Sequence, residues 1–199
     1  MNDTQIWWYV ARATGLVAWG LVTASVIAGI MLSTRLTRGR PTPGWLQDVH
    51  RFLGGLAVIF TGLHLSGLVA DNFVHFGFAD LFVPFASSWQ TVGVALGVAA
   101  LYLLLAVEIT SLLMRHLPRV WWKRLHLTSY ALFWFATIHL VTSGTDATNA
   151  AARWSANLAM AAVVFLTLVR VWSPRGRRAA RSAREKLDRS APSGSEVTN

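Results

Sequence analysis

The sequence predicts an all-α integral membrane protein, a bundle of about five transmembrane helices. Of its 199 residues, 54% are hydrophobic and only 14% are charged, which is less charge than a soluble domain carries. Several apolar stretches are about 20 residues long, the length that a helix needs to cross the hydrocarbon core of a bilayer. Only helices and closed barrels satisfy their backbone in lipid, and these runs are too long for barrel strands.

Five spans are expected between stretches that contain proline, glycine or charged residues. They cover residues 7–32, 46–70, 90–114, 121–143 and 153–172. Residues 1–172 are therefore expected to form one membrane domain. Residues 173–199 are rich in Arg, Ser and Ala and predict a basic, disordered cytoplasmic tail drawn to anionic lipid. A docking site for a cytoplasmic partner is the alternative role for this tail.

The positions of the cations predict the orientation. The loop after the first span, the loop after the third and the tail are basic, whereas the loop at 71–89 has two aspartates and no Lys or Arg. The positive-inside rule then places the N-terminus outside and the C-terminus in the cytoplasm of a multi-pass cell-membrane protein. The basic residues of the two loops are Arg35, Arg38, Arg40, Arg115, Arg119, Lys123 and Arg124.

Charge and cysteine content exclude several classes of function. The net charge of +9 is concentrated beside the spans and in the tail, not on a face of a soluble fold, so nucleic acid is not expected as a partner. The chain contains no cysteine, which excludes disulfides, thiol catalysis, cysteine-ligated iron–sulfur clusters and c-type haem attachment. The first span is too long for the apolar core of a signal peptide and is expected to stay in the mature protein.

Histidines lie at two depths of two spans. His50 and His64 lie 14 residues apart on the second span, and His126 and His139 lie 13 apart on the fourth. Both spans run outward in the predicted topology, so His50 is level with His126 and His64 with His139. The two levels are about 20 Å apart at 1.5 Å per residue. Two facing imidazoles, repeated at a second depth, are what two bis-histidine haems stacked across a membrane require.

The fourth span has a geometric difficulty. Fourteen residues at 100° each bring the second ring within about 40° of the first, but thirteen miss by about 140° on an ideal helix. The fourth span is therefore expected to bend or to contain a locally tightened turn. Small residues about one turn beyond the histidines are expected to leave room for a porphyrin edge: Gly54, Gly67, Ser129 and Ser143. Aromatic residues expected between the two depths are Phe60, Phe133 and Trp134.

Two simpler interpretations of the histidines stay open. A single histidine in a membrane span is commonly a packing or hydrogen-bonding residue, and histidine chains also act as metal or proton relays in transporters. Four at matched depths on two parallel spans favour the haem interpretation. His75 and His116 lie in loops without a partner at their depth and are expected to be bystanders.

The sequence resembles the ferric reductase-like transmembrane domain, which is shared by ferric reductases, NADPH oxidases and the haem-binding membrane subunit of the bacterial methionine sulfoxide reductase system. The resemblance lies in the two histidine spacings and in PRVWWKRLHLTSY at 118–130, which enters the fourth span. It also includes the Arg-x-Thr-Gly sequence from Arg12 to Gly15 and the Thr-Ser pair at 110–111, and it covers most of residues 7–172.

The resemblance implies two b-type haems and electron flow from the cytoplasmic face to the outer face. His50 and His126 would hold the inner haem, and His64 and His139 the outer haem. Only 27 residues follow the last span, too few for the flavin and nicotinamide domains of the larger relatives. The donor is therefore expected to be a separate reductase, a free flavin or quinol. One span fewer than the six often assigned to the family leaves the packing at the edge of the bundle undetermined.

Charged residues near the histidines are candidates for contacts with haem propionates, because a guanidinium suits a carboxylate. These are Arg51, Lys123 and Arg124 on the inner side and Arg12 and Arg153 on the outer side. Snorkelling to the membrane surface explains them equally well. Glu108 is a carboxylate in the interior of the third span. It is a functional candidate, although an ion pair with Arg51, Arg124 or Arg170 is the favoured explanation.

The loop at 71–89 contains five phenylalanines among few charges and predicts a segment lying on the outer membrane face. Two roles are open for it: a cap over the outer haem, or simple packing against the bundle.

The expected function is transmembrane electron transfer, as the membrane haem subunit of an oxidoreductase. A cytoplasmic-side partner would supply single electrons, and the acceptor would be ferric iron, oxygen or an extracytoplasmic redox protein. A metal or proton transporter that uses the histidines as a relay is one rival hypothesis, and a membrane scaffold without redox activity is another.

Overall fold

The computed structural model describes residues 3–34, 44–71, 76–143 and 150–172, and these residues form helices and short connections without any strand. Five helical stretches are long and apolar enough to cross a membrane. The described helices are α1 (Asp3–Thr34), α2 (Gly44–Ala70), α3 (Phe78–Phe82), α4 (Thr91–Leu112), α5 (Arg119–Leu127), α6 (Ser129–Ser143) and α7 (Ala150–Trp172). The five expected spans are confirmed as helices, with boundaries within a few residues of the predicted ones.

The fourth span is not one continuous helix but is divided into α5 and α6 at Thr128. The Thr128 amide donates to the carbonyl of Leu125, three residues back, at 3.0 Å. Such a bond is a 3₁₀-type contact, which tightens one turn and changes the direction of the side chains beyond it. Regular bonding resumes when the Leu132 amide donates to the Thr128 carbonyl at 2.9 Å. The expected tightened turn is thus confirmed, between the two histidines of this span.

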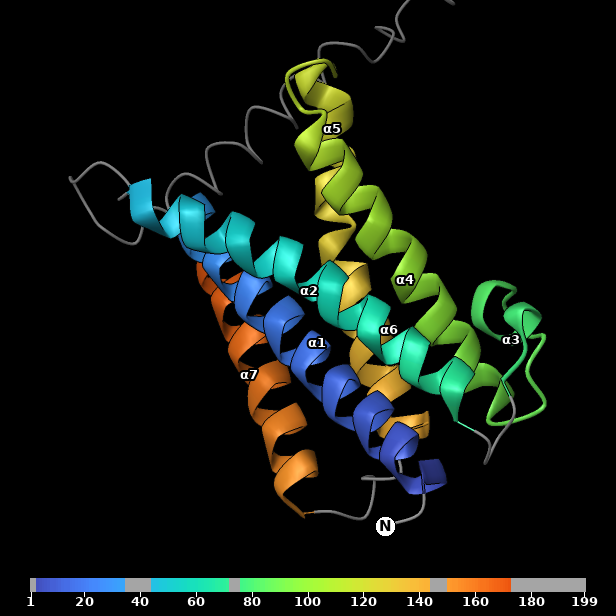
Figure 1. The fold of residues 1–199 in the computed structure, drawn as a ribbon. Coiled ribbons are helices and arrows are strands. Elements are labelled where there is room, and N and C mark those ends of the chain that lie inside the picture. Colours follow the sequence, from blue (N-terminus) through green and yellow to red (C-terminus); the bar gives the residue numbers. More distant parts are fainter. Residues whose placement is uncertain (1–2, 35–43, 72–75, 144–149, 173–199) are drawn as a thin grey trace, which may run out of the picture.

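Two antiparallel helix pairs form the bundle. α1 packs along α2, and α4 packs along α6, while α7 covers the other side of α1 (Figure 1). α3 lies at one end of the bundle and α5 at the opposite end (Figure 1). Gly67 allows the close approach of α1 and α2, because a Cβ at this position would lie 2.9 Å from the backbone of Ala11.

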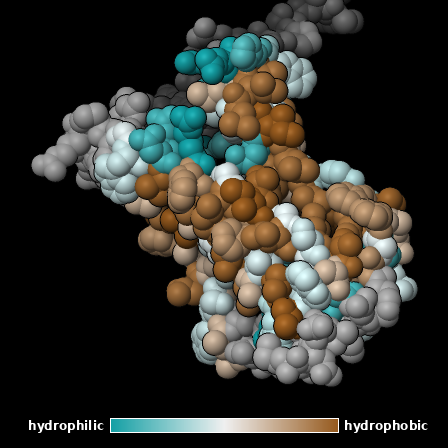
Figure 2. Space-filling model, in the orientation of Figure 1, coloured by the Kyte–Doolittle hydropathy of each residue, from teal (hydrophilic) through white to brown (hydrophobic). Residues whose placement is uncertain are grey.

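Apolar side chains from five of the helices meet in one core between the two pairs. Its most buried members are Ile30, Ala57, Phe133 and Val163. The outer surface of the helices is also apolar: Phe52, Leu158 and Phe165 are each at least 65% exposed. Figure 2 shows this brown surface along the bundle, with hydrophilic residues gathered toward the end that carries α5. Helices that are apolar on all sides are typical of a bundle whose solvent is lipid.

The connection after α2 folds back over one end of the bundle. Leu81 of α3 is buried, whereas Phe78, Phe82 and Phe85 are exposed. The Tyr102 hydroxyl of α4 donates to the carbonyl of Phe82 at 2.6 Å and ties α3 to the bundle.

Several sequence predictions lie outside the described residues. These are the tail at 173–199, the first-loop cations Arg35, Arg38 and Arg40, and His75.

Candidate functional site

The four histidines of the second and fourth spans meet in two pairs. The ring centroids of His50 and His126 are 5.9 Å apart, with an interplanar angle of 80°. Those of His64 and His139 are 6.5 Å apart, with an angle of 75°. Each pair joins α2 to the α5–α6 span, and the two pairs occupy opposite halves of the bundle. The pairing expected from the matched depths is therefore the pairing that the fold produces.

The pair of His64 and His139 is called the outer pair here, after its place in the predicted topology. It is held by backbone carbonyls of the neighbouring helices. Nδ1 of His64 donates to the Ala11 carbonyl at 2.7 Å, and Nδ1 of His139 donates to the Gly93 carbonyl at 2.8 Å. A carbonyl can only accept, so Nδ1 carries the proton in both rings and Nε2 keeps its lone pair. This second contact fixes the ring orientation and tautomer in the way seen for histidines that bind metals.

The inner pair, His50 and His126, is held by hydrogen bonds to Nδ1 as well, but the bonds to its two rings differ in strength. Nδ1 of His50 donates to the carbonyl of Ser25 at 2.9 Å, with the Ser25 hydroxyl at 3.1 Å. Nδ1 of His126 has only the Ser111 hydroxyl, at 3.4 Å. The indole of Trp122 stacks on His126, with centroids 5.1 Å apart and planes at 24°. A weaker hydrogen bond and an aromatic cover thus replace the backbone carbonyl at this one position.

Three glycines make room for the rings, and sequence reasoning missed this role. A Cβ at Gly15 would lie 2.8 Å from His64, one at Gly29 would lie 3.2 Å from His50, and one at Gly97 would lie 2.7 Å from His139. In each case the glycine follows the carbonyl that binds the ring by four residues. Gly15 and Gly29 are 14 residues apart, the spacing of His50 and His64, and this shared period is the signal that could have revealed them.

The small residues predicted to flank a porphyrin have other neighbours. Gly67 faces the α1 backbone, as described above, so its predicted role beside a macrocycle is wrong. Gly54 faces the carboxyl group of Glu108. Ser143 is the exception, since it lines the outer cavity together with His139.

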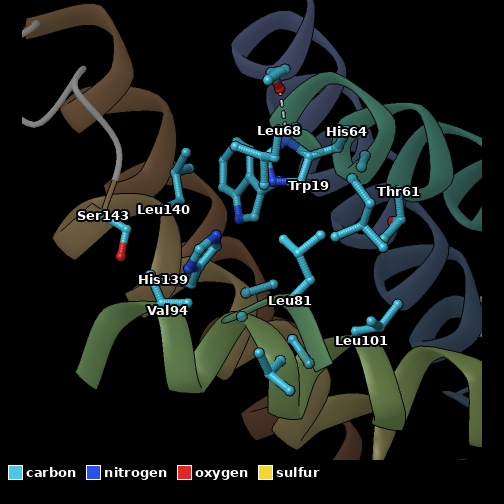
Figure 3. Close-up of a pocket in the computed structure, with 18 of the residues that line it drawn as sticks. Trp19, Thr61, His64, Leu68, Leu81, Val94, Leu101, His139, Leu140 and Ser143 are labelled. Carbon is cyan, nitrogen blue, oxygen red and sulfur yellow. Dashed lines mark hydrogen bonds between the residues drawn. The ribbon is translucent and has the colours of Figure 1, made fainter. Parts of the chain in front are cut away.

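A cavity of about 240 Å³ lies at the outer pair. His64 and His139 enter it from opposite sides, and Trp19 lies beside them (Figure 3). Leu81 of α3 also lines the cavity, so the described residues 76–89 cover this site as well as packing on the bundle. The remaining walls are mostly aliphatic, with a few polar groups among them.

Each pair has the spacing of two imidazoles that share one metal ion. Two rings bonded to an ion on opposite sides, at about 2 Å per bond, place their centroids roughly 6 Å apart. Within the described residues no group of three His, Cys, Asp or Glu side chains gathers to hold a metal ion. Two protein ligands would suit an ion that a cofactor already holds, as a haem holds its iron.

The region between the two pairs is apolar and aromatic. Phe133 is fully buried there and contacts Trp134, with centroids 5.4 Å apart. The Trp19 indole donates to the Thr137 hydroxyl at 3.0 Å and so links α1 to α6. Trp19 was missed by sequence reasoning because it lies on a helix without a histidine; one turn separates it from Gly15.

Of the five candidate cations, one reaches a site. Arg12 lines the outer cavity, with its guanidinium 4.9 Å from the centroid of the Trp8 ring. Arg51, Lys123 and Arg153 are exposed, and Arg124 is exposed with its guanidinium 5.8 Å from the Trp121 centroid. His116 is also exposed, as expected for a residue outside the pairs.

The favoured ion pair for Glu108 is absent. Its carboxyl lies against Gly54, one turn beyond His50, and within the described part of the chain no ion pair joins it to Arg51, Arg124 or Arg170. Arg170 instead donates to the Tyr130 hydroxyl at 2.9 Å. Helix packing turns Glu108 toward α2, and spacing along a single helix could not reveal this.

One family profile matches the chain over residues 6–146, and its description is Domain of unknown function (DUF8596). The chain belongs to this DUF8596 family. The matched region includes all four paired histidines, and the fifth long helix, α7, follows it. No match was found among curated proteins or among solved structures.

Proposed function

We propose that this DUF8596 chain is a transmembrane di-haem b electron-transfer protein, similar to the ferric reductase-like transmembrane domain. The observation that carries the proposal is the pair of cross-helix histidine couples, with centroids 5.9 and 6.5 Å apart. Backbone carbonyls hold three of the four rings with Nδ1 protonated, which leaves Nε2 for an iron. When bound, the haems supply the one-electron redox chemistry.

The protein's own residues have three roles in this proposal. His50 with His126 holds the inner haem, and His64 with His139 holds the outer one. Gly15, Gly29 and Gly97 let the rings sit close to the neighbouring helices. The packed layer around Phe133 fills the space between the sites with apolar side chains, which would disfavour water and proton passage there.

The proposed setting is the cell membrane, with the N-terminus outside and the C-terminus in the cytoplasm. The five apolar helices and the exposed apolar side chains support insertion. The orientation rests on the positive-inside rule, since the α4–α5 end of the bundle is basic and the connection at 71–89 is acidic. Electrons then enter at the His50–His126 couple and leave at the His64–His139 couple.

A separate donor on the cytoplasmic side completes the proposal: a reductase, a free flavin or quinol. The acceptor is extracytoplasmic: ferric iron, oxygen or a redox protein. In this assignment the chain is the membrane haem subunit of an oxidoreductase, and Arg12 is positioned to bind a haem propionate at the outer site.

The test is the absorption spectrum of the purified protein with a haem assay. We expect b-type bands after reduction by dithionite and about two haems per chain. His64→Ala and His139→Ala should each remove the outer haem and leave the inner one, which halves the haem content. His116→Ala is the matched control and should keep both haems, because His116 is exposed and outside the pairs.

Other results would contradict the proposal. A colourless protein with bound zinc would favour a metal relay, and one with neither metal nor haem would favour a scaffold. Loss of both haems, or of neither, in the His64→Ala and His139→Ala variants would contradict the pairing.

A further inference from the structure

The hydrogen bonds that hold the four histidine rings differ in length. His50, His64 and His139 each donate from Nδ1 to a backbone carbonyl, at 2.9, 2.7 and 2.8 Å. Nδ1 of His126 lies 3.4 Å from the Oγ of Ser111. A hydrogen bond from nitrogen to oxygen is commonly about 2.9–3.0 Å long, so this fourth bond is weak. The inner pair therefore joins one firmly bonded ring to one weakly bonded ring, whereas both rings of the outer pair are firmly bonded.

Trp122 keeps the weakly bonded ring in place by packing. It precedes His126 by four residues, about one helical turn within α5, and its indole stacks on the imidazole with centroids 5.1 Å apart. The buried Nε1 of Trp122 has no hydrogen-bond partner in the described part of the chain, so the indole supports the ring by contact alone. The position of the His126 ring and the strength of its Nδ1 bond thus depend on different residues.

The strength of the Nδ1 bond affects a metal at Nε2. A hydrogen bond from Nδ1 to an acceptor makes the imidazole a more basic ligand. A more basic ligand stabilises the ferric ion more than the ferrous ion, because the ferric ion carries the higher charge. Hydrogen bonding around the axial ligands is for this reason one of the ways in which a protein adjusts the reduction potential of a haem. A weak bond at His126 raises the potential of the iron that this ring binds.

We propose that Ser111 is a positioning residue that sets the reduction potential of the inner haem through His126, and that its weak hydrogen bond makes the inner haem the more readily reduced of the two. This inference rests on the proposed function and concerns the regulation of its inner site. One electron passes from the ferrous inner haem to the ferric outer haem, and no proton moves. An inside-negative membrane potential favours outward movement of an electron, so outward flow is compatible with this order of potentials.

Charged side chains near the two pairs also affect the potentials. Asp71 and Asp80 line the outer cavity together with Arg12, and their carboxylates favour a ferric outer haem. Arg170 lies close enough to His126 to act on it electrostatically, and its positive charge favours a ferrous inner haem. Glu108, which lies against Gly54, acts in the opposite direction. Variants of Ser111 that carry no charge separate the contribution of the hydrogen bond from these effects.

The order of the potentials is tested by a redox titration of the purified protein, followed by its absorption spectrum. The unaltered protein should be reduced in two one-electron steps at different potentials. The His64→Ala variant lacks the outer haem in the proposed assignment, so the step that it retains identifies the inner haem. We expect this retained step to be the one at the higher potential.

The role of Ser111 is tested with two variants that shift the inner potential in opposite directions. Ser111→Asn offers an uncharged carbonyl oxygen to Nδ1 and should lower the inner potential by up to about 59 mV, which is tenfold in the equilibrium constant for one electron. Ser111→Ala removes the acceptor and should raise the inner potential by a smaller amount. The electron paramagnetic resonance signal of the ferric inner haem should shift in both variants, and that of the outer haem in neither.

Thr110→Val is the matched control on the same helix. The Thr110 hydroxyl donates to the carbonyl of Ala106 at 2.6 Å, which is a bond within α4. Its removal should leave both potentials and both resonance signals as they are in the unaltered protein. Haem content is measured for every variant, so that loss of a haem is not mistaken for a shift.

The inference is overturned if the inner haem has the same potential as the outer haem or a lower one. It is also overturned if Ser111→Asn shifts the inner potential no more than Thr110→Val does. If Ser111→Asn loses the inner haem, Ser111→Ala decides, and an unchanged inner potential in that variant overturns the inference. These results leave two haems per chain and the haem assignment standing. Absence of haem is a different failure, because it removes the proposed function itself.

Discussion

At the scale of single residues, three of the four rings depend on a backbone contact from another helix. A carbonyl binds Nδ1 and a glycine four residues later makes room for the ring, at His50, His64 and His139. The Ser111 hydroxyl serves at His126 instead. The site is therefore specified as much by residues without functional groups as by the imidazoles.

Gly97→Ala tests this dependence. The added Cβ would lie 2.7 Å from His139, so the ring must move, and overpacking of this kind costs about 1–3 kcal/mol. We expect lower occupancy of the outer haem or a shifted outer-haem spectrum, and a lower melting temperature. Gly20→Ala is the control, because nothing lies within 4 Å of its Cβ, and alanine in a helix is favoured by up to about 1 kcal/mol over glycine. Equal spectra and equal melting temperatures for the two variants would contradict this role for Gly97.

At the scale of elements, two irregular features shape the sites. The interruption at Thr128 separates α5 from α6, so each segment directs one histidine toward α2. The short helix α3 places Leu81 in the wall of the outer cavity. Both features lie where the chain departs from a regular span. The interruption sets the direction of the histidine rings, and α3 limits access to the outer cavity.

Tyr102→Phe tests the attachment of α3. It removes the hydroxyl bond to Phe82, worth about 1 kcal/mol, and an opening equilibrium should rise about fivefold. Hydrogen–deuterium exchange measured by mass spectrometry should show faster exchange for Phe78–Phe82. Tyr9→Phe, which changes an exposed ring on α1, should leave that segment's exchange unaltered. If exchange at α3 stays the same in Tyr102→Phe, other contacts hold the cover.

At the scale of the whole molecule, the proposed direction of electron flow depends on the orientation in the membrane. The absence of native cysteine makes this directly testable with single cysteines. Ser88→Cys and His116→Cys introduce thiols at exposed positions on opposite ends of the bundle. In intact cells a membrane-impermeant maleimide should label Ser88→Cys and not His116→Cys, and lysis should expose the second. The reverse pattern would invert the proposed direction.

The sequence by itself determined the five helices and the depths of the four histidines. Both are local properties: lipid leaves an apolar run of about 20 residues little alternative to a helix, and a fixed rise per residue converts spacing into depth. The 13-residue spacing on the fourth span even required the tightened turn found at Thr128.

Only the tertiary structure decided what surrounds the rings. The Gly97 contact with His139, the close approach of Gly67 to Ala11 and the Glu108 contact with Gly54 each join two helices. The cavity that brings Asp71 and Ser143 together does the same. Such contacts depend on the rotation and crossing of packed helices, and these are set by side-chain interlocking across the whole bundle, not by the period of any one segment.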